Sequence, residues 1–598
     1  MFFRTKSIKG SRLVQLVHSY RNSDGLPRQR VIASLGDAAI PEAEKPLIAS
    51  MVERRIHGGG DFFDSSLSKT ASSWVDRIVQ LAGRSQAAKP VPQATVDGVI
   101  LDSIETTDVV ELGPELVGLK AWEELHFTGM LEALGMNPSA IATAQLMVSN
   151  RLIEPLSEWA LIDWSHRTAL PELLDIRITK SAKDRLYRTS DDLMALRKDI
   201  ESTLRERERD LFSLSRSVIL YDVTNSHFEG LCASNPKAKH GKNKQHRNDC
   251  RQVAVGIAFD EHGFPLAHET FEGNMGDTKT LPIILDRLAR HEQGLKPVVI
   301  LDAGFASHAN LALLKERGYS YIVNITRGSR SKYADSFEKE TFEVLPGRSE
   351  EKRVEVKKIT DPEDPASHLV LCRSAQRRLK EEAMVSSAGK RFLAAASALG
   401  KSIEKGVFKR AAVIERKIGA LQKRHARTAR FYTLKHNAGR LEITRDDDKM
   451  KNAIAQCGDY VLKTDKSLGA TQLWELYMTL LKAEAGFRQL KGTLGLRPNF
   501  HQLEDRVDGH IFISVLAYHL LCWINKRLEA HSDTRDWQTI RRLLGTHSLV
   551  TTRLPLADGR TINIRKPSQP DDEQKRVYQM LGIDWKAAFP TRKTEIPA

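Results

Sequence analysis

Three carboxylates in the 598-residue sequence occupy positions where acidic side chains can act together. Asp222 ends the apolar stretch 218–221, and Asp302 ends the apolar stretch 297–301. Both stretches are predicted strands, and ligands of an open α/β sheet bind beyond the carboxyl ends of its strands. Glu484 lies on a predicted helix. The sequence therefore offers two aspartates and a glutamate for one site.

The helix that carries Glu484, predicted to begin near residue 471, has one face of mixed chemistry. Tyr477, Leu480, Glu484, Arg488 and Lys491 are separated by offsets of 3, 7, 11 and 14 residues from the tyrosine. At about 100° per residue, these offsets fall within a face about 80° wide. A carboxylate, two cations and a phenol therefore point the same way, whereas a purely solvated helix scatters its charges.

Two aspartates and a glutamate suit a hard divalent cation that prefers oxygen ligands, such as Mg²⁺. Two such ions can activate a water or a 3′-hydroxyl and stabilise the leaving oxygen of a phosphodiester. Lys491 and Arg488 would hold the flanking phosphates. The acids also have simpler interpretations, because an aspartate at a strand end is commonly a turn or cap residue. Glu484 can equally be a solvated helix residue, and sequence spacing alone does not bring the three acids together.

The elements around the two aspartates follow an α/β order. Three strands, a helix, a strand, a helix and a strand are predicted at residues 218–222, 253–259, 266–271, 281–290, 297–302, 310–317 and 319–325. The inner strands are apolar on both faces, which is typical of a sheet covered by helices on both sides. The predicted fold class is therefore α/β, with a mixed sheet flanked by helices.

Other elements precede this block. A β-meander is predicted for residues 1–37 with a turn at 22–25, and a helical stretch broken by glycines 58–60 leads to a linker at 87–93. Helices are predicted at 122–134, 140–148 and 181–211. The predicted domains are 1–110, 111–212, 213–328, 329–458, 459–530 and 531–598.

A basic insertion interrupts the α/β block between residues 329 and 458. Residues 377–445 hold 18 Lys and Arg against 5 Asp and Glu, a net charge of +13 in a chain of net charge +15. A solvated helical hairpin is the simpler interpretation, but so unbalanced a charge repels itself unless anions are near. We therefore expect its helices, among them 391–399 and 411–430, to contact a DNA backbone. A polar tail from residue 531 closes the chain.

A basic loop joins the first two predicted strands of the block beside Asp222. Such a charge run is often simply solvated, but next to a phosphodiester site phosphate contact is equally expected. The candidates for this contact are Lys239, Lys242, Lys244 and Arg247.

Composition limits the class of protein. With 41% hydrophobic and 28% charged residues, the chain is too apolar for wholesale disorder. No apolar run reaches the roughly 18 residues of a membrane span, and the longest, near 511–524, is expected to be a buried helix. The start turns polar too early for a signal peptide, and five dispersed cysteines suggest no disulfide framework. We expect a cytoplasmic protein without a membrane partner.

The order of the acids resembles that of a known enzyme family. A strand with Asp, a strand with Asp and a helix with Glu, with a large insertion before the glutamate, resemble the RNase H-like core of DDE transposases. More closely, the chain is similar to insertion-sequence transposases with a Tyr-x2-Arg-x3-Glu-x6-Lys signature. Here that signature is Tyr477-x2-Leu480-x3-Glu484-x6-Lys491, with leucine at the arginine position.

Other stretches also resemble this family, so the resemblance covers most of the chain. They are residues 33–36 (ASLG), 151–158 (RLIEPLSE), 220–224 (LYDVT), 271–277 (FEGNMGD), 301–305 (LDAGF), 485–491 (AGFRQLK) and 496–498 (LRP). Each acidic motif is weakly specific alone, and the motifs are specific taken together.

The resemblance implies roles for the site residues. Asp222, Asp302 and Glu484 would be catalytic acids that bind two Mg²⁺ ions, for which Mn²⁺ can substitute. Tyr477 and Lys491 would handle the DNA end beside the cut.

The position of Leu480 departs from the signature, because a leucine cannot grip a phosphate. We expect Arg488 to supply the missing cation. On the same reasoning, Leu480→Arg is expected to strengthen the binding of DNA ends.

The resemblance also implies an activity and partners. The activity is metal-dependent cleavage at insertion-sequence ends, followed by transfer of the 3′-hydroxyls into target DNA. The partners are double-stranded DNA, both terminal inverted repeats and target, and a second copy of the chain in a homodimer that pairs two ends. The protein would be nucleoid-associated, and the meander with the helices up to residue 212 would read the terminal sequence.

Two other functions stay open from the sequence. An RNase H-like endonuclease or junction resolvase would cut DNA without joining ends. A catalytically inactive derivative would bind DNA and show no metal-dependent activity.

Overall fold

Two compact units make up the chain. One comprises Met1–Glu105, Thr552–Asn563 and Thr594–Ala598, and the other comprises Thr106–Thr551 and Ile564–Lys593. The computed structural model describes residues 1–8, 11–21, 26–56, 68–86, 95–179, 182–241, 243, 247–289, 296–326, 328 and 332–597. The features predicted at 22–25, 58–60 and 87–93, together with Lys242 and Lys244, lie outside the described residues.

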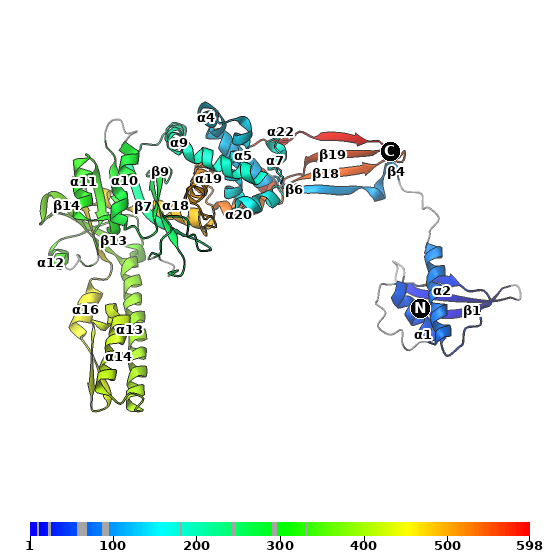
Figure 1. The fold of residues 1–598 in the computed structure, drawn as a ribbon, viewed down its shortest axis with the longest axis horizontal. Coiled ribbons are helices and arrows are strands. Elements are labelled where there is room, and N and C mark those ends of the chain that lie inside the picture. The colour runs from blue at the N-terminus through cyan, green and yellow to red at the C-terminus, as the bar shows by residue number, and fades with distance from the viewer. Residues whose placement is uncertain are drawn as a thin grey trace. The chain divides into compact units, whose positions relative to one another are not determined.

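A nine-stranded mixed sheet is the centre of the larger unit (Figure 1). Its order is β12-β13-β14-β17-β11-β10-β7-β8-β9. In chain order the strands are β7 (Val218–His227), β8 (Gln252–Phe259), β9 (Pro265–Glu272), β10 (Val298–Leu301), β11 (Ser320–Asn324), β12 (Glu343–Val344), β13 (Val354–Asp361), β14 (Asp364–Ser374) and β17 (Asp459–Thr464).

Three strands of this sheet, β7, β10 and β11, are parallel neighbours. The strands β8 and β9 continue from β7 as an antiparallel meander, and β17 is antiparallel to β11. The order β9-β8-β7-β10-β11, with two crossover helices, is the mixed RNase H-like arrangement that the sequence predicts. The predicted α/β fold class is confirmed.

Helices cover both faces of the sheet. On one face, α10 (Asp277–Ala289) and α11 (His308–Glu316) connect β9 to β10 and β10 to β11, and they pack on a core that includes Tyr221 and Leu301. On the other face lie α17 (Ala470–Met478), α18 (Leu480–Gly492) and α19 (Glu504–Ala530), which share a core with Leu220 and Ile300.

The helix α19 confirms the prediction of a buried apolar helix near 511–524. By length and composition it is the one helix among the described residues that could cross a membrane, yet its most apolar window is wholly buried in the protein. His519, on this helix, lies 2.5 Å from Glu208, so its polar atoms are satisfied inside the core.

A helical region precedes the sheet and packs on the α19 side. Its helices are α3 (Gly113–Glu124), α4 (Phe127–Ala133), α5 (Pro138–Ile153), α6 (Glu158–Trp164), α7 (Leu170–Leu173), α8 (Lys183–Ala195) and α9 (Arg197–Phe212). Two predicted helices, 122–134 and 181–211, are each divided. His126 adopts a left-handed φ of 57° between α3 and α4, which interrupts helical hydrogen bonding, and Leu196 separates α8 from α9.

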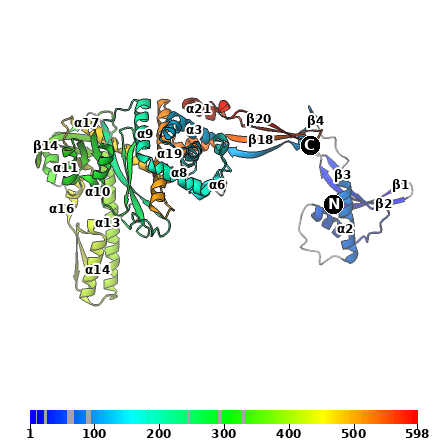
Figure 2. The ribbon, with the colours of Figure 1, turned by 45° about the horizontal axis from the view of Figure 1, so that its top comes forward.

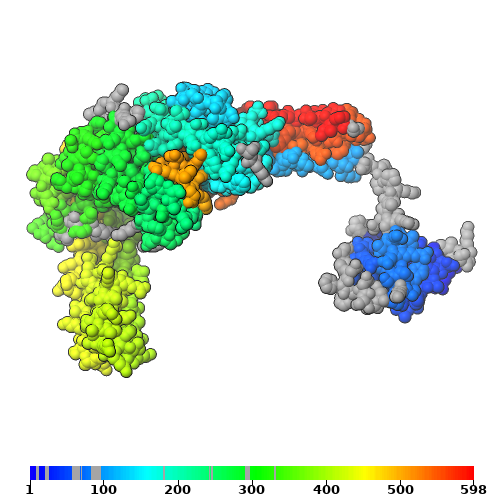
Figure 3. Space-filling view, viewed as in Figure 1, coloured from blue at the N-terminus to red at the C-terminus, as the bar shows by residue number. Residues whose placement is uncertain are grey.

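The predicted insertion at 329–458 divides into two parts. Its first part supplies β12, β13 and β14, which extend the sheet. The remainder folds apart as α13 (Ala375–Glu404), α14 (Ala411–Arg424), α15 (Ala426–Ala429), β15 (Tyr432–Asn437), β16 (Arg440–Arg445) and α16 (Asp447–Ala455). This part has its own core around Phe392, Ile414 and Ile418, and it projects from the sheet with α13 beside α14 (Figures 1 and 3). We call residues 375–455 the basic insertion.

The N-terminal strands form the predicted meander. β1 (Phe2–Ile8), β2 (Ser11–Arg21) and β3 (Pro27–Ser34) form an antiparallel sheet in that order. The helices α1 (Lys45–Ile56) and α2 (Lys69–Gln86) pack on one face of it, where Val14, Leu16 and Ala33 are buried. A separate two-stranded ribbon, β4 (Thr95–Val96) with β5 (Val99–Ile100), follows.

The polar tail from residue 531, in which the sequence predicts no helix or strand, is folded. It contains α20 (Trp537–Leu544), β18 (Ser548–Pro555), β19 (Thr561–Pro567), α21 (Asp572–Leu581), α22 (Trp585–Ala588) and β20 (Arg592–Ile596). Together with β6 (Glu105–Glu111), its strands form a sheet in the order β20-β19-β18-β6 (Figures 1 and 2). α20 buries Trp537, Ile540 and Leu544 at helical spacing, and α21 buries Val577, Tyr578 and Leu581, whereas α22 buries none of its residues.

Candidate active site

Asp222 and Asp302 occupy matching positions of neighbouring parallel strands. The register places Tyr221 of β7 opposite Leu301 of β10, and the next residue of each chain is an aspartate. Neighbouring strands lie about 4.8 Å apart. The two carboxylates therefore leave the same edge of the sheet side by side.

Both aspartates belong to the face of the sheet that α18 covers. Leu220 and Ile300 contribute to the core on that face, whereas Tyr221 contributes to the core beneath α10. Because successive side chains of a strand alternate between faces, Asp222 lies on the α18 side. Asp302 continues the row of Ile300 just beyond the end of β10.

Backbone amides orient both side chains. Val223 N donates to Asp222 Oδ1 at 2.8 Å, and Ala303 N donates to Asp302 Oδ1 at 2.7 Å. Asp302 is the cap of a short 3-10 turn, is exposed, and lies where the chain leaves the sheet, whereas Asp222 is half-buried. Each carboxylate thus accepts a hydrogen bond from the backbone amide of the residue that follows it.

The strand β11 brings an amide to Asp302, and the helix α17 brings a phenol. Val323 of β11 lies opposite Leu301, so Asn324 extends the row of the two aspartates. Burial raises the pKa of Tyr477, the charge of Asp302 raises it further, and a hydrogen bond with Asn324 opposes both effects. Tyr477, at the end of α17, therefore stays a neutral phenol beside Asp302.

Glu484 lies on α18, which packs against β7. Ala483, Phe487 and Leu490 of this helix are buried in the same core as Leu220. Glu484 itself is exposed. The helix that carries the predicted third acid therefore covers the face of the strand to which Asp222 belongs.

The predicted helix of residues 471–490 is divided at Thr479. α17 ends at Met478 and α18 begins at Leu480. The Thr479 hydroxyl donates to Leu476 O at 2.6 Å, a side-chain bond that competes with the helical ladder. Tyr477 and Glu484 therefore lie on two successive helices, and the single face expected from their spacing spans this break.

Leu480 is buried in the core under α18, with 7% of its surface exposed. An arginine at this position would enter an apolar environment instead of reaching a phosphate. The structure thus argues against the expectation that Leu480→Arg strengthens DNA binding. It also explains why a leucine occupies this position, because its side chain packs in the core.

The two predicted cations of α18 differ in their surroundings. Arg488 is exposed, and Lys491 is half-buried with its Nζ 5.7 Å from the ring centre of Phe487. The lysine stem therefore covers an aromatic residue of the core while its charge lies at the surface.

The basic loop after β7 is only partly available to phosphates. Lys239 is paired through its backbone with Gln252, at 2.9 and 3.1 Å, and its side chain is exposed. Arg247 instead contacts Asp249 at 3.1 Å, so its charge is already compensated. Lys239 therefore stays a candidate for phosphate contact, and Arg247 is the weaker candidate.

Asp277 is a fourth carboxylate near the pair, which the sequence analysis included in a motif without giving it a role. A Cβ atom placed on Gly304 would lie 3.0 Å from Asp277 Oδ2, so this carboxylate lies against the turn after Asp302. Burial raises the pKa of Tyr221, and the charges of Asp222 and Asp277 add to the rise. Asp277 thus adds negative charge to the same edge of the sheet.

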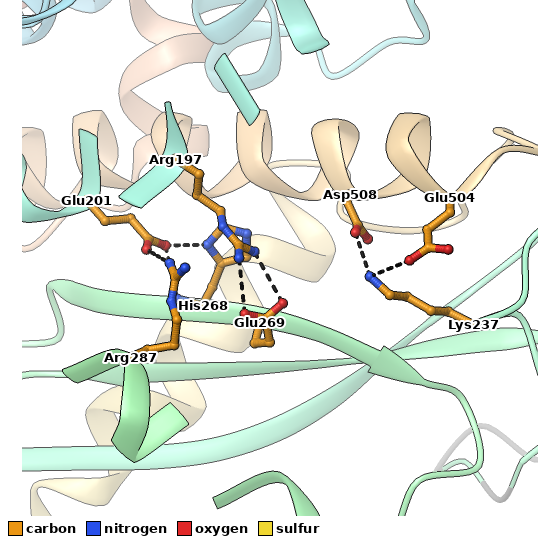
Figure 4. A network of polar contacts seen from close by, with 8 residues as sticks. All are labelled: Arg197, Glu201, Lys237, His268, Glu269, Arg287, Glu504 and Asp508. Carbon is orange, nitrogen blue, oxygen red and sulfur yellow. Dashed lines mark hydrogen bonds and ion pairs between the residues drawn. The ribbon is translucent and has the colours of Figure 1, made fainter. Parts of the chain in front are cut away.

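A buried polar network fixes helix α9 to β9, two strands from β7 (Figure 4). Glu201 Oε1 lies 2.5 Å from His268 Nδ1, and its other oxygen pairs with Arg287. Arg197 contacts Glu269 at 3.1 Å. Burial raises the pKa of Glu201, but the surrounding cations outweigh it and lower the pKa to about 2.

A second polar cluster includes the start of the basic loop. Lys237 Nζ lies 2.6 Å from Asp508 and 3.0 Å from Glu504, both on α19 (Figure 4). The row of Asp222 continues through Ile257 of β8 to His268 of β9. The network therefore braces the strand edge that carries the first aspartate.

A match to known protein families identifies the kind of protein that carries this arrangement of acids. Residues 213–520, more than half of the chain, match the family described as transposase DDE domain. The chain belongs to this transposase family. Residues 3–57 match a second family, the N-terminal domain of IS1634 family transposases. The transposase is thus an enzyme that cleaves DNA and transfers strands, with its aspartate pair and Glu484 inside the matched catalytic span.

Among solved structures, the transposase is similar to a piggyBac transposase synaptic complex with hairpin DNA, determined by cryo-EM. The identity is 10%, the match covers 68% of this chain and 70% of that chain, and the TM-score is 0.35. The likeness is too distant to bear on individual residues. A comparison with curated proteins finds no match.

Within the described residues of the transposase, one trio has ligand atoms that all lie within 4.8 Å of one another, namely Glu158, His501 and His510. Asp222, Asp302 and Glu484 do not form such a group. Their wider spacing is compatible with two ions, because ions about 3.5–4 Å apart place the ligands of different ions further from each other.

The Glu158 trio does not fit a metal ion. Arg151 Nη2 lies 2.7 Å from His510 Nδ1, and a guanidinium can only donate. Burial holds the pKa of His510 well below its usual range, so the ring is neutral and its proton lies on Nε2. Neither ring nitrogen then offers a lone pair to a metal.

The trio instead joins distant motifs of the transposase. Arg151 and Glu158 frame the motif 151–158, and Glu158 Oε2 lies 3.0 Å from His501 Nε2. Arg151, Arg497 and His501 line a cavity of about 90 Å³. Burial raises the pKa of Glu158, but His501 and Arg151 outweigh it and lower the pKa to about 2. Sequence analysis could not find this cluster, because its members come from segments that are far apart in the chain.

The aspartate edge, by contrast, fits divalent ions. It presents oxygen donors, with no thiol or imidazole among the residues placed there above, and hard cations prefer such donors. Membership of the DDE family implies the use of divalent metal.

Proposed function

We propose that this transposase cleaves DNA at the ends of its own insertion sequence and joins the freed 3′-hydroxyls to target DNA. Asp222, Asp302 and Glu484 act as the catalytic acids. The observation that carries the proposal is the register of β7 and β10, which puts two aspartates side by side at the carboxyl edge of parallel strands. The helix of Glu484 covers the same face of the sheet.

Asp222, Asp302 and Glu484 would hold two Mg²⁺ ions, with Mn²⁺ as a substitute. Bound divalent ions supply Lewis acidity, which activates the attacking oxygen and stabilises the leaving oxygen of the phosphodiester. The amides of Val223 and Ala303 keep the two carboxylates oriented toward the edge of the sheet. Exposure of Asp302 leaves room for a DNA strand beside it.

Residues of α17 and α18 position the DNA. Tyr477 presents a neutral phenol beside Asp302, while Arg488 and Lys491 place two cations on the helix of Glu484. Tyrosine, glutamate and lysine stand at the spacing of the Tyr-Arg-Glu-Lys branch of transposases, to which we assign this chain. Lys239 adds a phosphate contact from the loop after β7.

Double-stranded DNA, as terminal inverted repeats and as target, is the partner in this proposal. The basic insertion, with most of the net positive charge of the chain, would contact the DNA backbone. A homodimer would pair two ends, one at each active site. A cytoplasmic, nucleoid-associated location follows from these partners.

The test uses the purified chain and duplexes that carry the ends of the element, with Mg²⁺ or with EDTA. We expect Mg²⁺-dependent breaks at the ends and joining of the 3′-hydroxyls to a target plasmid. Asp222→Ala, Asp302→Ala and Glu484→Ala should each lower cleavage by at least about a hundredfold while sparing DNA binding, because the acids hold the ions and not the duplex.

Glu475→Ala is the matched control, since Glu475 is an exposed glutamate on the preceding helix α17. It should cleave like the unchanged chain. Full cleavage by any of the three acid variants would remove that acid from the site, and cutting without joining would make the protein a nuclease.

A further inference from the structure

The three-stranded sheet of the N-terminal unit has two unlike faces. Val14, Leu16 and Ala33 point to α1 and α2 and are buried. The opposite face, which we call the outer sheet face, is covered by neither helix. Its residues include Phe2, Arg4, Lys6, Gln15, Gln29, Val31 and Ser34.

Charge is segregated across this unit. The strands β1, β2 and β3 contain six Lys or Arg residues and no Asp or Glu. Among the described acidic residues of this part, Glu42, Glu44 and Glu53 lie on α1 or on the chain leading to it, and Asp76 lies on α2. A sheet with cations and no carboxylate is suited to a polyanion.

Hydrogen bonds on the outer sheet face hold its polar side chains in place. Arg4 lies opposite Gln15, which lies opposite Ser34. Arg4 Nε donates to Gln15 Oε1 at 3.2 Å and Arg4 Nη1 donates to Gln29 Oε1 at 2.9 Å. Gln15 Nε2 donates to Ser34 Oγ at 3.0 Å. The guanidinium and two amides are therefore ordered before any partner binds.

These side chains are of the types that read base edges. Arginine makes paired hydrogen bonds to guanine, glutamine does so to adenine, and apolar atoms contact the thymine methyl. Exposed Phe2 and Val31 on the same face supply apolar atoms. Three strands span about 10 Å, which fits the B-DNA major groove of about 12 Å.

We infer that the outer sheet face enters the major groove of duplex DNA and reads its sequence, with Arg4, Gln15 and Gln29 as the base-reading residues. Lys6, which is exposed on the same face, contacts a flanking phosphate. The deep, narrow major groove of A-form RNA excludes such a sheet, so the partner is DNA. The inference rests on the proposed function, because a transposase must find specific ends.

The test is a selection by the full-length protein from a pool of random 20-base-pair duplexes, in EDTA so that no DNA is cut. The unchanged chain should enrich one motif. Arg4→Ala should bind the enriched duplex about tenfold or more weakly and should tolerate other bases at one or two positions. Gln29→Ala should relax a neighbouring position, and since Gln29 is exposed this variant keeps the fold if Arg4→Ala does not.

Arg54→Ala is the control, because it removes one positive charge from an exposed position of α1, away from the strands. It should enrich the original motif with unchanged affinity. The inference is overturned if the unchanged chain enriches nothing, or if Arg4→Ala and Gln29→Ala both enrich the original motif at full affinity. Asp302→Ala should keep the motif, so a failure of the catalytic proposal and a failure of this one give different results.

Discussion

At the scale of single residues, Leu480 occupies the arginine position of the family signature, and its side chain packs in the core. We predict that Leu480→Arg lowers the free energy of unfolding of the larger unit by about 3 kcal/mol or more, because a charged side chain would be buried without a partner. Thermal or urea unfolding followed by tryptophan fluorescence measures the change.

Leu481→Arg is the control for this substitution, because Leu481 is the next residue and is 53% exposed. It should leave the unfolding midpoint unchanged. If Leu480→Arg were as stable as Leu481→Arg and bound DNA ends more tightly, the sequence-based expectation would be right after all.

Glu115, buried in α3, makes stability depend on pH. Burial raises its pKa to about 7, although a hydrogen bond from Thr168 at 2.7 Å opposes the rise. The folded protein therefore binds a proton that the unfolded chain, with a pKa near 4.5, releases. The contribution of Glu115 to the free energy of unfolding is therefore fully present below pH 4.5 and is lost as the pH rises through 7.

We predict that Glu115→Gln removes this loss, because the amide oxygen still accepts from Thr168 and carries no charge. At pH 8 the variant should be more stable than the unchanged chain by about 3 kcal/mol, and at pH 4.5 the difference should vanish. Unfolding midpoints across this pH range provide the measurement. Glu123→Gln, at an exposed site of the same helix, should show no such pH-dependent gain.

The candidate site was predictable where it depends on neighbours in sequence. The sequence shows that Asp222 and Asp302 each end an apolar strand. The register of the two strands in the folded sheet then brings the aspartates together. No such sequence pattern marks Asn324, because its position beside Asp302 depends on the order of the strands in the sheet. His501 and His510 reach Glu158 only through tertiary packing, so periodicity could not reveal that cluster.

At the scale of elements, the basic insertion is a loop between two paired strands. Ser374 at the end of β14 donates to Gly458 O just before β17, at 3.1 Å, and Arg373 lies opposite Asp459. The chain thus leaves and re-enters the sheet at neighbouring positions, and an insertion at such a point need not disturb the core.

We predict that replacing residues 375–457 by an Asn-Gly turn leaves the catalytic unit folded, because the strand ends are already at hairpin distance. Non-specific duplex binding should weaken, and the slope of log affinity against log salt should fall by at least about 2, since each lost phosphate contact contributes about 0.9. Fluorescence anisotropy at several salt concentrations measures both quantities.

A full-length variant separates charge from shape in this prediction. Arg416→Gln, Lys423→Gln and Arg427→Gln together neutralise three exposed cations of the basic insertion. This variant should reproduce part of the loss in salt dependence. An unchanged salt slope in both proteins would show that the insertion does not contact DNA.

Strands were more predictable than helix ends and the C-terminal region. The strands of the α/β block are apolar runs bounded by turn residues, and they appear at the expected positions. The breaks at His126, Leu196 and Thr479 arise from local backbone and side-chain geometry that helical periodicity does not encode. Of the C-terminal helices, α20 and α21 bury only a few residues each and α22 buries none, so their sequences are mostly polar.

At the scale of the whole molecule, the positive charge lies in two places that are distant in sequence. The strands β1 to β3 carry cations without carboxylates, and the basic insertion carries a net charge of +13 between residues 377 and 445. The strands β1 to β3 also carry ordered arginine and glutamine side chains, whereas the basic insertion carries mainly Lys and Arg. Sequence-specific reading and general attraction to DNA are thus assigned to different parts of the chain.

The place of β17 between β14 and β11 has a consequence for synthesis on the ribosome. β11 and β14 emerge well before β17, so a growing chain holds two strands whose shared neighbour has not been translated. Unpaired strand edges promote aggregation. Translation that ends before codon 459 therefore yields an aggregation-prone fragment. We expect such a fragment to be degraded by proteases rather than to persist and compete with the full-length protein for the ends of the element.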